Sequence, residues 1–338
     1  MEFKRRLPIP KEIKQLYPLS AKGQKIREGC IKSIKDILRA DDNRIILLIG
    51  PCSADREDAV MEYLGRLKCL SDKVRDKIFI VPRLYTSKPR TSGNAYKGML
   101  HRPDPQSQTD DILKGVLSIR KIHLRALEEI GMGCADEMLY PENHRFISDL
   151  LCYVTIGARS ADDQQHKLTT SGLDIPVGIK NPLNGDLHAL SQDIITAQNP
   201  HLFIYRNWEV QSHGNPYAHA ILRGYVDHDG VHHQNCDRQS IEGLSTIMRD
   251  YPIQNPAIIV DCNHSNSGKD YLKQRDNAIK ALELKSSHNN YLKGLMIESY
   301  LEDGCQDEHG TIFGKSITDA CLGWEKTEKL VLKLADSF

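Results

Sequence analysis

The sequence repeats one arrangement eight times, a short aliphatic run followed by a segment in which apolar residues recur at helical spacing. The eight runs are residues 44–50, 79–81, 133–138, 153–156, 176–179, 201–205, 257–260 and 292–297. Strands that alternate with helices form a parallel sheet, and eight such units close into a barrel. We therefore predict an α/β fold, a (β/α)8 TIM barrel over residues 44–338.

Two segments fall outside this rhythm. Residues 1–43 form an N-terminal extension with a basic helix over 21–38, for which we expect oligomer or regulatory contacts. A long connection over 206–221 follows the sixth run. A doubly wound sheet is disfavoured because no glycine-rich dinucleotide fingerprint follows the first run.

Composition excludes several classes of partner. Lys plus Arg and Asp plus Glu balance at 45 each, which disfavours nucleic acid or an anionic membrane surface. The nine cysteines form no C-x-x-C pair and the N-terminus is too polar for a secretory signal, so we expect reduced thiols and a cytoplasmic protein. No apolar run approaches the roughly 18 residues of a membrane span.

Polar residues stand where the predicted strands end, which in a TIM barrel is the face that carries the active site. One position per unit comprises Cys52, Arg83, Glu137, Arg159, Lys180, Arg223, His264 and Glu298. Any one of them alone is as well explained as a core polar group or a solvated loop residue. Eight at one rim predict a functional site.

Cations dominate this rim. Arg83, Lys88, Arg90 and Lys97 follow the second run without an intervening acid. Taken alone the stretch also fits a solvated basic loop. Together with Arg159, Lys180 and Arg223, however, the positive charge suits two phosphorylated or carboxylated substrates.

A second group of rim residues combines soft and hard metal ligands, namely Cys52, His264, Glu298 and Asp319. Thiolate, imidazole and carboxylate together suit a divalent Mn, Fe, Co or Zn ion. The alternative for Cys52 is a small buried hydrophobe.

Two other motifs are set aside. Gly310 to Ser316 is one residue short of a phosphate-binding P-loop, and no strand precedes it. The histidine-rich segment 228–236 has the Gly and Asp content of an exposed hairpin or loop.

Several motifs together resemble one family, the type I, metal-dependent 3-deoxy-D-arabino-heptulosonate 7-phosphate (DAHP) synthases. They are IGPCS at 49–53, KPRT at 88–91, YKG at 96–98, IGARS at 156–160, PVGIKN at 176–181, AILRG at 220–224, DCNHSNSGK at 261–269, MIES at 296–299 and GKSITDACLGW at 314–324. The resemblance covers about residues 40–338. It implies condensation of phosphoenolpyruvate with erythrose 4-phosphate, the first step of the shikimate pathway.

The resemblance also implies roles for individual residues. Metal ligation falls to Cys52, His264, Glu298 and Asp319. Phosphoenolpyruvate is expected at Arg83 and Lys180 through its carboxylate, and at Arg159 and Arg223 through its phosphate. Arg90, Thr91 and Lys97 are expected to hold the sugar phosphate, Lys88 to donate or shuttle a proton, and Glu137 to position water. Because other cations surround Lys88, we expect its pKa to be lowered toward neutral pH.

Two other functions stay open. One is 3-deoxy-manno-octulosonate 8-phosphate synthase, which has Ala-Asn where this chain has Lys88-Pro89. The other is a non-catalytic barrel that binds phosphorylated metabolites.

The resemblance further implies a homodimer or homotetramer and a hairpin inserted after strand six over 206–221. It also implies inhibition by an aromatic amino acid through residues 1–43 and this hairpin. Asp174 and Tyr205 replace the small polar residues of the inhibitor pocket, which leaves the effector open. Cys321 is expected near Cys52, with oxidative inactivation through a disulfide between them.

Overall fold

Eight strands form one parallel barrel in the computed structural model, which describes residues 1–90, 95–286 and 291–337. Their order around the sheet is β2 (Ile78–Pro82), β1 (Ile45–Gly50), β12 (Leu292–Glu298), β11 (Ile258–Asp261), β8 (Ala218–Leu222), β5 (Val177–Lys180), β4 (Tyr153–Ile156) and β3 (Ala135–Glu137). The two ends meet where Arg83 bridges to Ala135 and the Leu84 amide donates to the Ala135 carbonyl at 2.8 Å. The predicted TIM barrel is confirmed.

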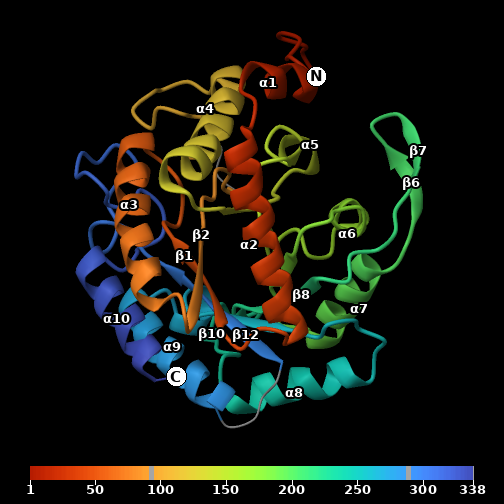
Figure 1. The fold of residues 1–338 in the computed structure, drawn as a ribbon, viewed down its shortest axis with the longest axis vertical. Coiled ribbons are helices and arrows are strands. Elements are labelled where there is room, and N and C mark those ends of the chain that lie inside the picture. Colours follow the sequence, from red (N-terminus) through yellow and green to blue (C-terminus); the bar gives the residue numbers. More distant parts are fainter. Residues whose placement is uncertain (91–94, 287–290, 338) are drawn as a thin grey trace.

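Helices surround the sheet (Figure 1). They are α3 (Glu57–Val74), α4 (Ile112–Arg125) with its π-helical continuation η1 (Ala126–Ile130), α5 (Pro141–His144), α6 (Gln164–Ser171), α7 (Leu187–Gln198), α8 (Arg238–Arg249), α9 (Gln274–Ser286) and α10 (Trp324–Asp336). Two 3-10 turns, η2 (His264–Ser267) and η3 (Tyr271–Lys273), precede α9.

Helix α5 has only four residues, and turns follow it up to Leu150. Arg120 of α4 reaches this segment, donating to the Phe146 carbonyl at 3.0 Å and pairing with Asp149 at 2.9 Å. The Phe146 carbonyl is thus bonded to a side chain from another helix.

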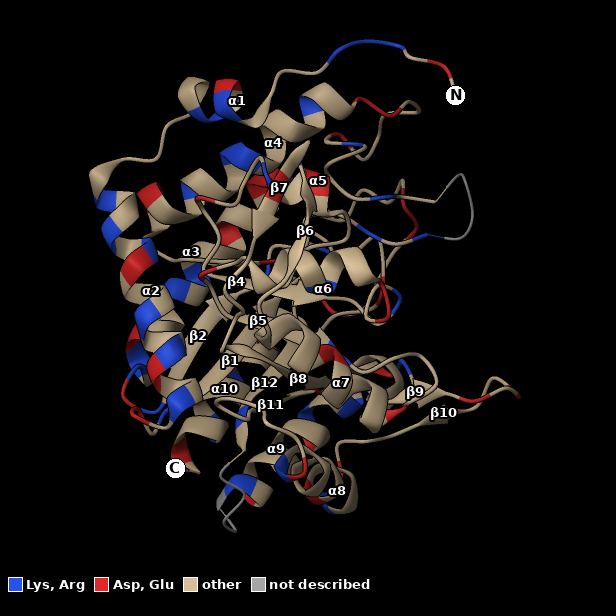
Figure 2. Ribbon diagram, turned by 90° about the vertical axis from the view of Figure 1, so that its right-hand side faces the viewer, with Lys and Arg blue, Asp and Glu red and all other residues tan. Residues whose placement is uncertain are grey.

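The extension is part of the barrel's core. Helix α1 (Pro10–Leu16) leads to α2 (Ala21–Arg39), whose Ile34, Ile37 and Leu38 pack in one cluster with inward-facing strand residues such as Ile46 and Met296. Outward-facing strand residues pack in a second cluster against the helices. In Figure 2 α2 lies to the left of the barrel and the hairpin of β9 (Tyr225–Val226) and β10 (His232–His233) extends to the right. Helix α2 therefore closes the amino-terminal end of the barrel.

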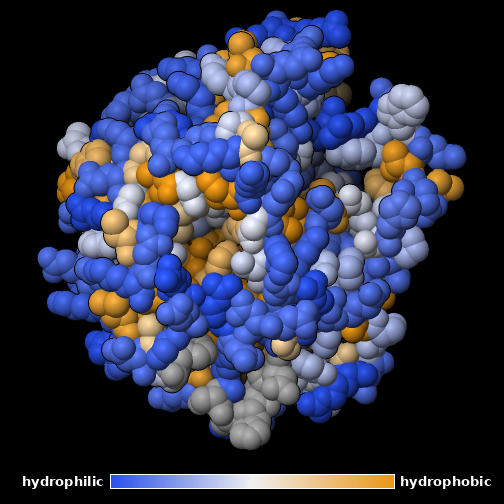
Figure 3. All heavy atoms as spheres, viewed as in Figure 1, coloured by the Kyte–Doolittle hydropathy of each residue, from blue (hydrophilic) through white to orange (hydrophobic). Residues whose placement is uncertain are grey.

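The assignment of 201–205 as the sixth barrel strand was wrong. Strand β6 (Leu202–Tyr205) pairs antiparallel with β7 (Trp208–Gln211) in a separate hairpin, and β8 is the sixth barrel strand. The hairpin therefore precedes strand six instead of following it. The misassigned run is exposed at Leu202 and Ile204, at 64% and 83%, and Figure 3 shows apolar atoms on the projecting hairpin.

The sixth barrel strand, β8, lacks the continuous aliphatic run by which the other strands were recognised. Strand β8, AHAIL, is entirely buried, but two alanines and a histidine interrupt its aliphatic character. The polar His219 is buried because Tyr153 of β4 lies 2.7 Å from its Nε2 and the Tyr217 carbonyl lies 2.8 Å from its Nδ1. Within the described residues, no helix is both long and apolar enough to cross a membrane.

Candidate functional site

The carboxyl ends of the barrel strands bring the predicted residues to one rim. Glu137, Lys180 and Glu298 are the last residues of β3, β5 and β12. The remaining rim residues follow the ends of their strands within three positions, namely Cys52, Arg83, Arg159, Arg223 and His264. Since parallel strands of a barrel end on the same face, these side chains surround a common space.

A thiol and two carboxylates form the centre of the rim. Cys52, Glu298 and Asp319 each place one ligand atom so that the three atoms lie within 4.8 Å of one another. Cys52 and Glu298 are fully buried. The segment carrying Asp319 is held against β12, because the Leu322 amide donates to the Glu298 carbonyl at 3.0 Å.

His264, the fourth predicted ligand, borders this group. Its Nε2 lies 3.8 Å from Glu298 Oε1, and its Nδ1 lies 2.9 Å from Asp261 Oδ2. The residue has a positive φ of 51° at the start of η2. An imidazole, a thiol and two carboxylates together match the donor set of a divalent transition ion.

Electrostatics fit a cation at this position. Burial and the negative charges of Glu298 and Asp319 raise the pKa of the Cys52 thiol, against the opposing charges of Lys88 and Arg83. Metal binding requires the thiolate, and a bound cation favours it. The residues present therefore fit a divalent ion.

Lys88 contacts the thiol directly. Its ammonium donates to the Cys52 carbonyl at 2.7 Å and lies 3.1 Å from the Cys52 sulfur. The expectation that the pKa of Lys88 is lowered was wrong: burial does lower it, but the charges of Cys52, Glu298 and Glu137 outweigh burial and raise it. Lys88 is therefore a protonated group in this geometry.

Arg83 is buried beneath the centre. Its Nη2 donates to Glu298 Oε1 at 3.0 Å, and its guanidinium lies over the Tyr85 ring at 4.0 Å. Although burial opposes ionisation, Arg83, His264 and Lys88 lower the pKa of Glu298 to about 2. Within the described part of the chain, Arg83 Nε and Nη1 have no hydrogen-bond partner. Buried donors of this kind are suited to an anionic ligand.

Arg223 offers a second such donor. It is 8% exposed, and its Nη1 is without a partner among the described residues. Burial lowers its pKa, with a further contribution from the positive charge of Arg159, which is itself exposed. Two arginines that affect each other in this way form a natural subsite for a dianion.

Asp261 is a rim residue that sequence reasoning missed. It accepts from Lys180 Nζ at 2.8 Å and faces His264 on its other side. Burial raises the pKa of Asp261, but the positive charges of His264 and Lys180 outweigh burial and hold this pKa well below its usual range. The signal was available, because Asp261 is the last residue of β11.

Asn263 was also missed. Its side-chain amide donates to Glu298 Oε2 at 2.5 Å, so it orients the carboxylate proposed as a metal ligand. It lies two residues after β11, in the motif DCNHSNSGK, from which only His264 was proposed as a site residue.

Glu137 is packed against a glycine of the next strand end. A Cβ on Gly157 would lie 2.1 Å from Glu137 Oε1, so a side chain at position 157 would require this carboxylate to move. The negative charge of Glu137 contributes to raising the pKa of Lys88, so the two side chains interact electrostatically.

Two of the three predicted sugar-phosphate residues, Arg90 and Lys97, are described by the structure and follow β2 along the chain. Arg90 is exposed and donates to the Tyr96 carbonyl at 3.0 Å, and Lys97 pairs with Asp110 at 3.0 Å. Thr91 lies outside the described residues.

The two motifs set aside earlier are not at the centre. The histidine-rich segment forms the β9–β10 hairpin, where His232 contacts Ser265 at 3.0 Å and His233 contacts Asp227 at 2.6 Å. Gly310 to Ser316 is a loop with Gly314 at a positive φ of 66°.

Cys321 lies beside Cys52, as expected. The Cys52 amide donates to the Cys321 sulfur at 3.4 Å, and both residues are fully buried as free thiols. The proposed disulfide stays a prediction.

Comparisons with known proteins agree with this geometry. The chain matches the DAHP synthetase I family over residues 18–332. It is 33% identical over 97% of its length to the Tyr-sensitive phospho-2-dehydro-3-deoxyheptonate aldolase of Escherichia coli, covering 92% of that protein. It is also 33% identical over 98% of its length to the phenylalanine-inhibited aldolase of Saccharomyces cerevisiae, covering 90% of it.

A solved structure resembles the whole chain. The phospho-2-dehydro-3-deoxyheptonate aldolase of Francisella tularensis superposes with a TM-score of 0.92 at 30% identity, covering 100% of this chain and 98% of that one. The full-length match in sequence and fold shows that the chain belongs to the DAHP synthetase I family.

Proposed function

We propose that this chain condenses phosphoenolpyruvate with erythrose 4-phosphate and water to give 3-deoxy-D-arabino-heptulosonate 7-phosphate and inorganic phosphate, the first step of the shikimate pathway. Family membership and the names of the relatives supply the reaction class. The observation in this chain that carries the proposal is the Lys88 ammonium beside the Cys52, Glu298 and Asp319 cluster, at a rim with unpartnered arginine donors among the described residues.

Phosphoenolpyruvate would bind to the buried cations. Arg83 and Lys180 would hold its carboxylate, while Arg223 and Arg159 would hold its phosphate. The unpartnered N–H groups of Arg83 and Arg223 in the described structure supply donors, and a bound anion would offset the burial of these charges. Without such a cation set, two phosphorylated substrates would repel each other strongly.

The reaction forms one carbon–carbon bond and one carbon–oxygen bond to water, and it breaks the carbon–oxygen bond to phosphate. The methylene carbon of phosphoenolpyruvate attacks the sugar aldehyde, and the aldehyde oxygen takes up a proton. Water then adds to the electron-poor enol carbon and loses one proton. Its second proton is lost as phosphate leaves from the same carbon, which gives the keto group and inorganic phosphate.

Lys88 is the proposed proton donor to the aldehyde oxygen. Its raised pKa keeps it protonated, as a donor requires. Glu137 is the proposed group that orients the attacking water and accepts its proton, a role supported by the effect of its negative charge on Lys88. Arg90, Thr91 and Lys97 would hold the phosphate of the sugar.

A divalent Mn, Fe, Co or Zn ion would be held by Cys52, His264, Glu298 and Asp319. When bound it would supply Lewis acidity toward the aldehyde carbonyl. Asn263 and Asp261 would orient Glu298 and His264, as outer partners of metal ligands commonly do.

Regulation and assembly are part of the proposal. Relatives are named as Tyr-sensitive, phenylalanine-inhibited and Trp-sensitive, so we propose inhibition by an aromatic amino acid. We also propose a homodimer or homotetramer, supported by the exposed Leu202, Ile204 and Trp208 on the β6–β7 hairpin. A cytoplasmic location stays a prediction from the cysteine pattern.

The test follows the loss of phosphoenolpyruvate absorbance with metal-loaded enzyme. Turnover with erythrose 4-phosphate that EDTA abolishes is the expected result. Turnover with arabinose 5-phosphate instead would assign the enzyme to the octulosonate reaction, and no turnover with either sugar would favour a binding protein. Adding Phe, Tyr and Trp separately to the active enzyme identifies the effector.

A further inference from the structure

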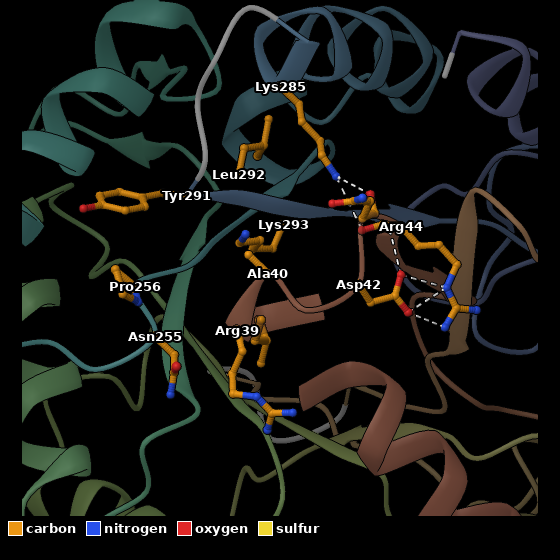
Figure 4. A pocket seen from close by; sticks show the side chains of 12 residues that line it. Arg39, Ala40, Asp42, Arg44, Asn255, Pro256, Lys285, Tyr291, Leu292 and Lys293 are labelled. Atoms are coloured by element: carbon orange, nitrogen blue, oxygen red, sulfur yellow. Dashed lines mark hydrogen bonds and ion pairs between the residues drawn. The ribbon is translucent and has the colours of Figure 1, made fainter. Parts of the chain in front are cut away.

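A positively charged cavity lies at the amino-terminal end of the barrel, opposite the proposed active site. Its volume is about 470 Å³. It is lined by the end of α2 and the following turn (Leu38, Arg39, Ala40, Asp42, Asn43, Arg44), by Asn255 and Pro256 before β11, and by Lys285, Tyr291, Leu292 and Lys293. Figure 4 shows these side chains arranged around the cavity.

The two arginines of the cavity are already paired. Arg44 is bonded to the Asp42 carboxylate at 2.9 and 2.6 Å, and Arg39 to Asp41 at 2.7 Å and to Asp36. Their charges are therefore balanced by neighbouring carboxylates, including the single acid that lines the cavity.

Lys293 is not balanced in this way. The residue is only 9% exposed, and no hydrogen bond or ion pair joins its ammonium to another described residue; the ammonium is not among the fully buried unpartnered atoms, so it reaches the open space of the cavity. Lysine is rarely buried unless it is paired, and a buried unpaired charge is costly. Burial accordingly lowers the pKa of Lys293.

A bulge at the start of β12 gives Lys293 its unusual position. Ile258 and Ile259 are consecutive in β11, but they pair with Leu292 and Gly294, so Lys293 is the extra residue. An extra residue of this kind redirects a side chain out of the regular alternation of a strand. The structure thus presents the ammonium to the cavity.

Lys285 brings a second ammonium to the same cavity. It donates to the Asn43 and Arg44 carbonyls at 3.2 and 3.4 Å. Burial and then the positive charge of Lys293 lower its pKa to about 8, against the charge of Asp42. The two lysines therefore repel each other across the cavity.

We propose that this cavity is a binding site for a phosphate group, which Lys293 and Lys285 hold between them. Ammonium groups bind phosphate as compact point charges, whereas the flat guanidinium forks here are already occupied by carboxylates. A dianion would neutralise both lysines and supply the partner that Lys293 lacks in the described structure. It would also link the end of α2 to α9 and β12. The group could be inorganic phosphate or part of a phosphorylated metabolite.

Site-specific acylation tests this directly. Neutral lysines react with acetic anhydride, so the labelling rates of Lys285 and Lys293 can be followed by peptide mass spectrometry. We expect both rates to fall together as inorganic phosphate replaces chloride at constant ionic strength, by about tenfold at ten times the dissociation constant. This readout is separate from activity and from phosphate bound at the rim, which would affect Lys88 with its own concentration dependence.

The variants and ligands separate the outcomes. Lys293→Met should remove the protection of Lys285, while Lys280→Met, at an exposed position of the same helix, should leave it unchanged. Glycerol 3-phosphate is the second ligand tested. If it protects the lysines and inorganic phosphate does not, the occupant is a phosphate monoester. If both protect them, the phosphate group is sufficient for binding. If neither ligand slows labelling relative to chloride at the same ionic strength, the proposal is overturned. Lys293→Met should fold, since it removes an unpaired buried charge, and circular dichroism checks this.

Discussion

The Lys88 ammonium lies 3.1 Å from the Cys52 sulfur and also donates to the Cys52 carbonyl. This contact joins the proposed proton donor to the proposed metal centre. Glu298 and Glu137 add negative charge around the same ammonium, and the pKa of Lys88 is consequently raised. The arrangement is that of a general acid whose proton is retained until a substrate oxygen accepts it.

Replacing Lys88 by Met should lower kcat by about 10² to 10³, the usual contribution of general acid catalysis, with a smaller change in KM for phosphoenolpyruvate. Metal content should be unchanged, because Lys88 is not a ligand. Steady-state kinetics and metal analysis of the same preparation measure both. Undiminished kcat would remove Lys88 from the mechanism.

Cys52→Ser should weaken Co²⁺ binding by more than about tenfold and abolish the thiolate-to-metal absorption band of the Co²⁺ enzyme, because the soft ligand is lost. Cys134→Ser is the matched control, since Cys134 is a buried thiol that donates to the Met132 carbonyl instead. Optical titration with Co²⁺ reports both variants. A band that survives in Cys52→Ser would show that another cysteine ligates the metal.

Arg223→Met should raise KM for phosphoenolpyruvate about 30-fold or more, corresponding to about 2 kcal/mol for a buried charged hydrogen bond. Arg66→Met should have no effect, because Arg66 is half-exposed on α3 and pairs with Glu62. Initial rates at varied phosphoenolpyruvate and saturating sugar measure the difference. Equal KM values in the two variants would place the substrate phosphate elsewhere.

Gly157→Ala should lower activity more than stability, since the new Cβ would force the Glu137 carboxylate to move. Gly65→Ala has nothing within 4 Å of the added Cβ and should leave activity unchanged. The comparison uses kcat together with urea unfolding. If Gly157→Ala keeps full activity, the position of Glu137 is not important for the reaction.

Acid should destabilise the fold through His219. Burial lowers the pKa of its imidazole to about 4. The Tyr217 carbonyl requires a proton on Nδ1, so Nε2 accepts from Tyr153 and the neutral form is fully bonded. Because the unfolded chain binds this proton near pH 6.5, stability falls as the pH drops from about 6.5 through 4, by about 3 kcal/mol in total.

The His219→Gln variant isolates this contribution. It should be less stable than the parent at pH 7, yet the difference between them should shrink as the pH falls to 4. Urea unfolding at half-unit pH steps measures that difference. A constant difference would mean that His219 does not titrate in this range.

Seven of the eight barrel strands could be predicted from sequence because they lie within short aliphatic runs, the usual pattern of strands buried on both faces. Strand β1 is fully buried and reads IILLIG. Strand β8 is equally buried but reads AHAIL, and its histidine is satisfied only by Tyr153 of another strand. The burial of β8 therefore depends on a residue distant in sequence, which periodicity does not reveal. The aliphatic run at β6 was taken for the sixth barrel strand instead.

The order of strands and helices along the chain was enough to predict the barrel and the rim, because this order limits the fold and parallel strands all end on one face. Which rim groups contact one another depends on how the chain folds in three dimensions. The pairing of Arg83 with Glu298, the place of Asp261 between Lys180 and His264, and the raised pKa of Lys88 depend on charges brought together from different strands. The bulge that presents Lys293 to the opposite cavity likewise depends on the register of two strands, and register is a property of the pair.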